Sequence, residues 1–152
     1  MTDRAVAWRA YFEASARLQT RLDRELREAV GLNLIDYNVL LALEEAQEHR
    51  LRMGELAAAL VFSPSRLTYQ VSSMERRGLV RREPCSEDGR GLSAALTEAG
   101  HAAFQEAWRH HERGVREHFL DLLSDEDASV VQRVFSNLGT KLTGEAPRAA
   151  GC

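Results

Sequence analysis

The stretch SPSRLTYQVSSMERRGLV, residues 63–80, decides the fold that we expect for this chain. Ser63 is a favoured N-cap, and Pro64 suits the first helical position, where its missing N–H costs nothing. Gly78 is the usual residue for a left-handed helix stop. These signals predict a helix over residues 64–77, and this helix is the reference for the rest of the chain.

Only one narrow stripe of this helix is apolar, because Leu67, Val71 and Met74 recur at i, i+4 and i+7. The other faces carry arginine, glutamine, tyrosine and small hydroxyl side chains, with no acid before Glu75. Arginine and glutamine can form paired hydrogen bonds with guanine and adenine edges in the major groove. The alternative is an ordinary solvated helix face. The DNA-contacting residues expected here are Ser63, Ser65, Arg66, Thr68, Tyr69, Gln70, Ser73, Arg76 and Arg77.

The residues after Gly78 predict a β-hairpin with a long polar tip. Residues 79–82 and 92–96 are short strand candidates on either side of a tip rich in Pro, Ser, Asp and Gly. Arg90 lies between two glycines and two residues after Asp88, so its guanidinium can extend from the tip while the carboxylate restrains it. An arginine held in this way suits the narrow, electronegative minor groove.

Basic charge is concentrated in the same region. Residues 64–82 contain five arginines and one acid, although the formal net charge of the whole chain is −3. Such a local patch is compatible with site-specific DNA binding, whereas the overall charge argues against a protein that coats nucleic acid generally.

Three motifs occur in the order MGELAAAL (53–60), SPSRLTYQVSSMERRGLV (63–80) and DGRG followed by LTEAG (88–100). This order resembles the MarR family of winged helix-turn-helix transcriptional regulators. The resemblance covers about residues 32–100 by motif and the flanking helices by pattern only. It implies a two-fold dimer that intertwines its first and last helices, and ligands that bind where the dimer core meets the DNA-binding lobe.

Amphipathic helices are predicted on both sides of these motifs. Residues 5–30 have apolar positions at intervals of three and four, which predicts a helix of about seven turns ending at Gly31. A helix this long has little preceding chain to cover it, so we expect its stripe to pack partly on a second subunit. The alternative is a stripe covered wholly by its own domain.

Capping signals divide the rest of the chain. Asn33 with Asp36 predicts a helix to about residue 46, followed by a polar connection that can include a short strand and by a compact helix over 53–60. Thr97 is expected to cap a long helix after the wing. Ser124 with Asp127 is expected to cap a last helix that ends at Gly139.

We therefore predict a mainly α fold with a small β-hairpin wing, about six helices and an intertwined helical dimer interface. One domain is expected over residues 1–142, with dimerisation helices at about 5–30 and 97–140 and a DNA-binding lobe at about 33–96. Residues 143–152 have the composition of a disordered tail. The lack of a signal peptide or a long apolar run predicts a cytoplasmic protein with no membrane segment.

Catalytic motifs are absent from the sequence, which has no G-x-S-x-G elbow, phosphate loop, H-E-x-x-H or C-x-x-C. We therefore expect no enzyme activity and no cofactor. The four histidines of the helix after the wing, at positions 101, 110, 111 and 118, include no i, i+4 pair, so no metal site is predicted. A metal-responsive regulator remains an alternative.

The expected function is that of a homodimeric repressor that releases a pseudo-palindromic DNA operator when it binds a small aromatic or phenolic effector. An apolar cleft between the first helices and the long helix after the wing would hold this effector. The competing interpretation is that the same aromatics fill the dimer core. The candidate ligand-binding residues are Trp8, Tyr11, Phe12, Tyr37, Trp108 and His111.

A redox switch at Cys85 is a further alternative. Arg81 and Arg82 would make its surroundings electropositive and favour a reactive thiolate. The MarR resemblance does not support this alternative, because oxidant-sensing members place their cysteine near the start of the first long helix. The sequence leaves the operator, the regulated genes and the identity of the effector open.

Overall fold

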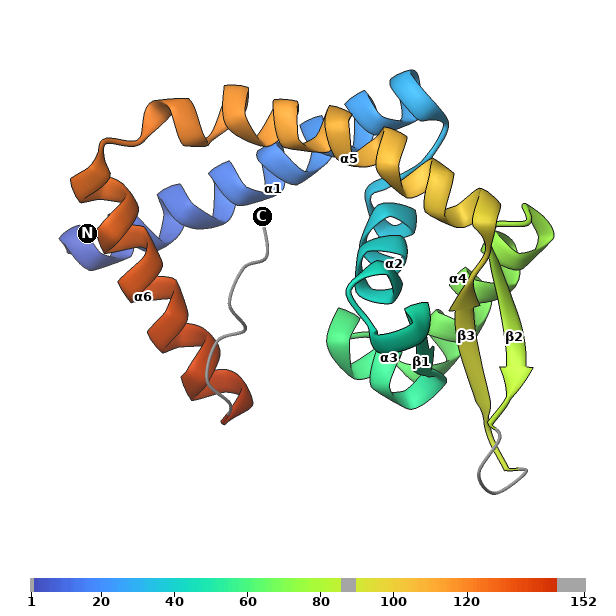
Figure 1. Ribbon diagram of the computed structural model, residues 1–152. Helices are drawn as coiled ribbons and strands as arrows, with labels where there is room; N and C mark the ends of the chain where they lie inside the picture. Colours follow the sequence, from blue (N-terminus) through green and yellow to red (C-terminus); the bar gives the residue numbers. More distant parts are fainter. Residues whose placement is uncertain (1, 86–89, 145–152) are drawn as a thin grey trace. The chain divides into compact units, whose positions relative to one another are not determined.

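The computed structural model describes residues 2–85 and 90–144 (Figure 1). Within these residues the chain forms six α-helices, two 3₁₀ turns and three β-strands, which confirms the predicted mainly α fold with a small wing. The helices are α1 (Asp3–Val30), α2 (Leu34–Glu44), α3 (Met53–Leu60), α4 (Pro64–Arg76), α5 (Glu98–His118) and α6 (Asp125–Thr143). The 3₁₀ turns are η1 (Gln47–His49) and η2 (Leu120–Leu122), and the strands are β1 (Arg50–Arg52), β2 (Val80–Pro84) and β3 (Leu92–Leu96).

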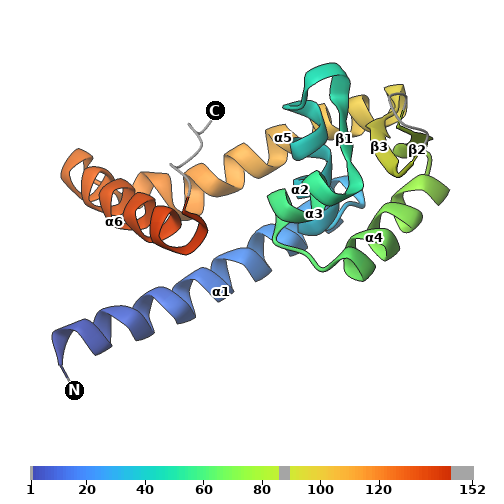
Figure 2. The same ribbon diagram turned by 90° about the horizontal axis from the view of Figure 1, so that it is seen from below.

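The chain divides into two compact units, Met1–Gly114 and Val115–Cys152. In the first unit, α2, α3, α4 and the sheet gather at the end of α1 that leads into α2, as both views show (Figures 1 and 2). The second unit contains the last residues of α5, the turn η2 and α6. The helix-turn-helix and the wing therefore belong to the same unit.

Local capping chemistry accounts for most helix boundaries. Gly31 ends α1 in the left-handed conformation, with φ of 70°. Asn33 and Asp36 form the predicted capping box of α2, in which each side chain accepts a hydrogen bond from the backbone N–H of the other. The Ser63 hydroxyl accepts the Arg66 N–H at 3.3 Å and begins α4. The predicted start signals of α2 and α4 are thus confirmed.

The sheet has three antiparallel strands in the order β1-β3-β2. The hairpin pairs Val80 with Leu96 and Pro84 with Leu92, so β2 continues two residues beyond its predicted end at Arg82. The short strand β1 joins the free edge of β3 through pairs such as Leu51 with Ala94. This third strand connects the wing to the segment that precedes the helix-turn-helix.

The core of the first unit lies between α2, α3, α4 and the hairpin. Leu67, Val71 and Met74 of α4 are each at most 1% exposed, which confirms the predicted apolar stripe. Burial of this stripe gives α4 its hold on the domain, since each such side chain contributes roughly 1.5–3 kcal/mol. The opposite faces of α4 remain available for other contacts.

One predicted helix end is wrong, and a second is shifted by two residues. The last helix does not end at Gly139 but continues to Thr143, because the left-handed conformation occurs at Gly144, whose φ is 71°. The helix predicted to end near residue 46 ends at Glu44. There the chain enters the turn η1, in which Glu48 and His49 both have positive φ. Gly139 keeps helical backbone angles and therefore does not end the helix.

None of the helices within residues 2–85 and 90–144 combines the length and the apolar character that crossing a bilayer requires.

The start of α5 depends on a close backbone approach at Gly100. A Cβ atom at this position would stand 1.9 Å from the Leu79 carbonyl oxygen, inside any permitted contact distance. We expect Gly100→Ala to lower the free energy of unfolding by about 2–4 kcal/mol, measured by urea denaturation.

The matched control is Gly54→Ala in α3, where an added Cβ would meet nothing within 4 Å. Relief of glycine's conformational entropy should leave this variant unchanged or up to about 1 kcal/mol more stable. Equal stability of Gly100→Ala and the wild type would show that α5 does not need this close approach to Leu79.

Candidate functional site

The face of α4 that points away from the core is polar and open to solvent. Tyr69 is 74% exposed. The Arg66 guanidinium stacks on Phe62, 4.0 Å from the centroid of its ring, which steadies it near the beginning of the helix. The Thr68 hydroxyl donates to the Pro64 carbonyl at 2.9 Å and so lies against its own helix. The exposed side chains of α4 among the predicted DNA contacts are Ser65, Arg66, Thr68, Tyr69 and Arg76.

Two other predicted DNA contacts, Gln70 and Arg77, are bound to the protein itself. Gln70 Nε2 donates to Asp36 Oδ1 at 2.6 Å. Arg77 donates from both terminal nitrogens to the two oxygens of the same carboxylate, at 3.0 and 2.9 Å. Asp36 is only 1% exposed, and this pairing raises the pKa of Arg77. Gln70, Arg77 and Asp36 form what we name the Asp36 clamp, which joins the beginning of α2 to α4.

The arginines of the wing are also paired. Arg82 donates to Glu75 of α4 through its backbone N–H and its guanidinium, at 2.8 to 3.0 Å. Arg81 forms an ion pair with Glu83 on the same strand. Of the five arginines in residues 64–82, all of which the structure describes, only Arg66 and Arg76 form no salt bridge. The positive patch expected from sequence is therefore largely neutralised within the protein.

The base of the wing is closed before its tip. The Cys85 N–H donates to the Gly91 carbonyl at 3.3 Å, which continues the hairpin past β2. Arg90 is exposed beside this closure. Asp88, the predicted partner of Arg90, lies outside the described residues.

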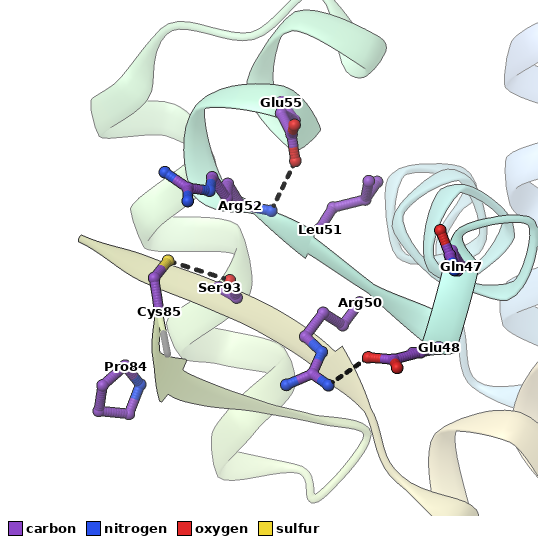
Figure 3. A pocket seen from close by; sticks show the side chains of 9 residues that line it. All are labelled: Gln47, Glu48, Arg50, Leu51, Arg52, Glu55, Pro84, Cys85 and Ser93. Atoms are coloured by element: carbon purple, nitrogen blue, oxygen red, sulfur yellow. Dashed lines mark hydrogen bonds and ion pairs between the residues drawn. The ribbon is translucent and has the colours of Figure 1, made fainter. Parts of the chain in front are cut away.

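Cys85 is a buried thiol at the edge of a pocket of about 490 Å³ (Figure 3). Its side chain is 8% exposed, and its Sγ lies 3.3 Å from the Ser93 hydroxyl. Arg81 and Arg82 are each paired with an acid, and the arginines that line the pocket beside the thiol are Arg50 and Arg52 instead. A covered thiol of this kind is a poorer target for oxidants than an exposed one.

The predicted effector residues fall into separate groups. Tyr37 stacks on His111 with ring centroids 4.2 Å apart. It also stacks on Phe104, with ring centroids 5.8 Å apart. Burial raises the pKa of Tyr37 to about 12 and lowers the pKa of His111, so both rings are neutral near pH 7. Trp108 lines a neighbouring pocket of about 330 Å³ together with Glu44, Phe104, Gln105 and Arg109.

The aromatics of the first helix form a different group. Trp8 lies 5.9 Å from Tyr11 and 5.6 Å from Phe12, between ring centroids, and Trp8 and Phe12 are 61% and 60% exposed. Gly114 of α5 meets α1 at Leu22, where an added Cβ would stand 2.9 Å from that side chain. Leu22 is roughly 15 Å along the helix from Phe12. The ring contacts of the single chain thus place the N-terminal aromatics and the Tyr37–His111 stack in separate groups.

Histidines of α5 contact other side chains of the protein. His101 Nδ1 lies 2.7 Å from the Glu44 carboxylate, and His110 lies 3.0 Å from Arg113. In the part of the chain that the structure describes, no three His, Cys, Asp or Glu side chains are placed to hold a metal ion.

Sequence reasoning missed Asp36 and Glu75 as parts of this site. The sequence identified Asp36 only as a helix cap, because its other partners are 34 and 41 residues away along the chain. The signal for Glu75 was its place as the single acid among five arginines. Both acids orient cations that would otherwise face solvent.

Comparison with known proteins agrees with this geometry. The model of the MarR family matches residues 30–91. The crystal structure of AbsC, a MarR family transcriptional regulator from Streptomyces coelicolor, is 39% identical, with a TM-score of 0.89 over 95% of this chain and 98% of that one. Sco3205, a MarR family regulator from the same organism solved in complex with DNA, is 33% identical, with a TM-score of 0.89 over 94% and 90% of the two chains.

Curated relatives match over a shorter region. The transcriptional repressor MprA of Escherichia coli is 32% identical over 82 residues, which are 54% of this chain and 47% of MprA. The alignment thus spans about half the length of that relative. The near-complete overlap with AbsC at 39% identity, together with the helix-turn-helix and wing described above, shows that this chain belongs to the MarR family.

Proposed function

We propose that this chain is a DNA-binding transcriptional regulator, acting as a repressor in the cytoplasm. The observation that carries the proposal is the exposed polar face of α4, which has arginine, tyrosine and small hydroxyl side chains and no acid before Glu75. Its fold relative Sco3205 was solved in complex with DNA, and its relative MprA is a transcriptional repressor. A helix with this face suits the major groove.

The proposed contacts differ in role along α4 and the wing. Arg66 is the candidate for reading a guanine edge, since its guanidinium is exposed and steadied by Phe62. Tyr69 and Arg76 extend from the same helix and suit base or phosphate contacts. Arg90 of the wing is proposed to enter the minor groove. Ser63, Ser65, Thr68 and Ser73 would allow the backbone to approach closely, and Asp88 would support Arg90.

A homodimer is proposed because apolar side chains remain uncovered in the single chain. The helix α6 has no buried residue, and its apolar face includes Val130, Val134, Phe135, Leu138 and Leu142, all at least 38% exposed. Trp8 and Phe12 of α1 are also large apolar side chains that are exposed in the single chain. Exposed apolar side chains that gather on one helix mark interaction surfaces. A two-fold dimer would place two α4 helices on successive major grooves of a pseudo-palindromic operator.

The proposed effector is a small aromatic or phenolic compound, bound at the pocket of Trp108 beside the Tyr37–His111 stack. This pocket of about 330 Å³ combines aromatic walls with a carboxylate and a guanidinium, a composition that suits a small planar ligand. We assign the Trp8, Tyr11 and Phe12 group to the dimer core. To release DNA, the ligand must bind more tightly to a state whose α4 helices miss the ~34 Å repeat of the half-sites.

Selection of DNA from a random pool tests the DNA-binding proposal. We expect the purified protein to select an inverted repeat with half-sites about one helical turn apart. Arg66→Ala should relax the preference at one position in each half-site and weaken operator binding by about 1–3 kcal/mol. Arg90→Ala should weaken it by a similar amount, about 1–3 kcal/mol, if its side chain enters the minor groove.

The control for lost charge is Arg24→Ala on α1. The Arg24 side chain is exposed, and its Nε lies 4.0 Å from the Glu28 carboxylate, which makes a weak ion pair. This variant should bind like the wild type. Recovery of no common sequence by the wild-type protein would refute the DNA-binding proposal.

Sedimentation tests the dimer. The wild-type protein should sediment as a dimer at micromolar concentration, and Val134→Asp combined with Leu138→Asp should dissociate it, because both positions become charged on the apolar face of α6. Gln132→Asp on the same helix is the matched control and should remain dimeric. A compact wild-type monomer that binds a single half-site would contradict the proposal.

The effector proposal is tested by operator release with a panel of aromatic acids and phenols, and with peroxide, on three proteins. Aromatic compounds should release DNA equally from the wild type and Cys85→Ser, because the thiol plays no part in their binding. Trp108→Ala should need about tenfold more compound, since an aromatic wall is worth roughly 1 kcal/mol or more. Release of the wild type by peroxide, with none of Cys85→Ser, would instead establish the redox alternative.

A further inference from the structure

The Asp36 clamp uses every strong acceptor position of one buried carboxylate. Oδ1 accepts from Gln70 at 2.6 Å and from Arg77 at 3.0 Å. Oδ2 accepts from Arg77 at 2.9 Å and from the Asn33 backbone N–H at 3.0 Å. The side chain of Asp36 is 2% exposed and that of Arg77 is 35% exposed. The carboxylate is therefore buried, whereas the arginine is partly open to solvent.

We propose that Asp36 is a positioning residue for DNA recognition: it sets the rotation of α4 about its own axis and withholds Gln70 and Arg77 from the DNA. This inference rests on the proposed DNA-binding function and deepens it. It also assigns Gln70 and Arg77 a different role from the base and phosphate contacts expected from sequence.

The chemistry of Gln70 supports this role. Reading adenine requires the amide oxygen and an amide N–H of glutamine to meet the same base edge together. The short bond from Gln70 Nε2 to Asp36 fixes the plane of the amide toward α2. Turning the amide to a base would remove a partner from a buried charge, which is strongly unfavourable. The fork of Arg77 is likewise engaged with both carboxylate oxygens, the strongest geometry available to it.

The spacing of the two anchors explains how one carboxylate orients a helix. Gln70 and Arg77 are seven residues apart, two turns along the same face of α4. An apolar stripe alone tolerates small rotations of the helix, because dispersion contacts have no fixed direction. Hydrogen bonds at two points resist such rotations, because each bond has a preferred direction. Tyr69 and Arg76 each precede an anchor by one residue, about 100° around the helix. Fixing the anchors therefore fixes the direction in which both exposed side chains point.

The first test compares operator and non-specific DNA affinities of Asp36→Asn, a variant of equal size that removes the charge. We expect the ratio of operator to non-specific affinity to fall at least tenfold, because α4 loses its fixed rotation while Arg66 and Arg76 keep their charge. Simple loss of folded protein would lower both affinities in the same proportion and leave the ratio unchanged. An unchanged ratio in a variant that keeps the circular dichroism spectrum of the folded wild type would overturn the proposal.

A double variant separates positioning from direct contact. Asp36→Asn with Arg77→Gln replaces the ion pair by two amides that can bond to each other. If Arg77 only positions α4, the double variant should recover part of the lost affinity ratio. If Arg77 contacts DNA, the double variant should bind more weakly than Asp36→Asn alone, and the proposal fails.

Gln70→Ala provides a decision that does not require Asp36→Asn to fold. Selection from a random pool should show loss of preference spread over all positions of the half-site, because the whole helix is less firmly oriented. Relaxation at a single position in each half-site would identify Gln70 as a base reader and overturn the proposal.

Hydrogen exchange distinguishes failure of this inference from failure of the proposed function. In Asp36→Asn without DNA, the amides of α4 should exchange at least tenfold faster, while those of the β2–β3 hairpin stay unchanged. Equal exchange in α4 overturns the positioning role. A wild-type protein that selects no DNA would refute the proposed function, and the exchange result would still decide whether Asp36 orients α4.

Discussion

The buried carboxylate of Asp36 is the interaction on which the arrangement of the helix-turn-helix depends. A charge that is 1% exposed must be paired, and its partners come from the beginning of α2 and from two turns of α4. The same residue caps α2, so one side chain both begins one helix and orients another. The apolar contacts of Leu67, Val71 and Met74 hold α4 to the core, and the Asp36 clamp decides which of its faces is turned outward.

The pairing of arginines changes how the surface of this unit should be understood. Asp36, Glu75 and Glu83 each bind an arginine from residues 64–82, so most of the positive charge in this stretch is already satisfied within the protein. The net charge of the chain is −3, and within this stretch only Arg66 and Arg76 are left without a salt bridge for long-range attraction. Selectivity in the proposed function would therefore depend more on oriented side chains than on a broad basic surface.

The second unit poses a different physical problem. Five apolar side chains of α6 are at least 38% exposed in the single chain, and none of its residues is buried. A helix that exposes a broad apolar face is stable mainly through packing on a partner surface. The uncovered face is thus the structural basis for proposing a dimer, and it separates the part of the chain that would assemble from the part that would contact DNA.

The sequence by itself determined the elements, because helix caps, stops and apolar spacing act over a few residues. The signals at Asn33, Ser63 and Gly78 and the stripe of α4 were sufficient to predict the helix-turn-helix and the wing. Tertiary structure alone decided which polar residues of α4 remain open: Gln70 and Arg77 have the same composition signal as Arg66, yet they are bound by an acid 34 and 41 residues away. It also separated Trp8 and Phe12 from the Tyr37–His111 stack and covered Cys85. Such outcomes depend on which segments the fold brings together, and a local sequence pattern does not specify contacts between residues that are far apart in the chain.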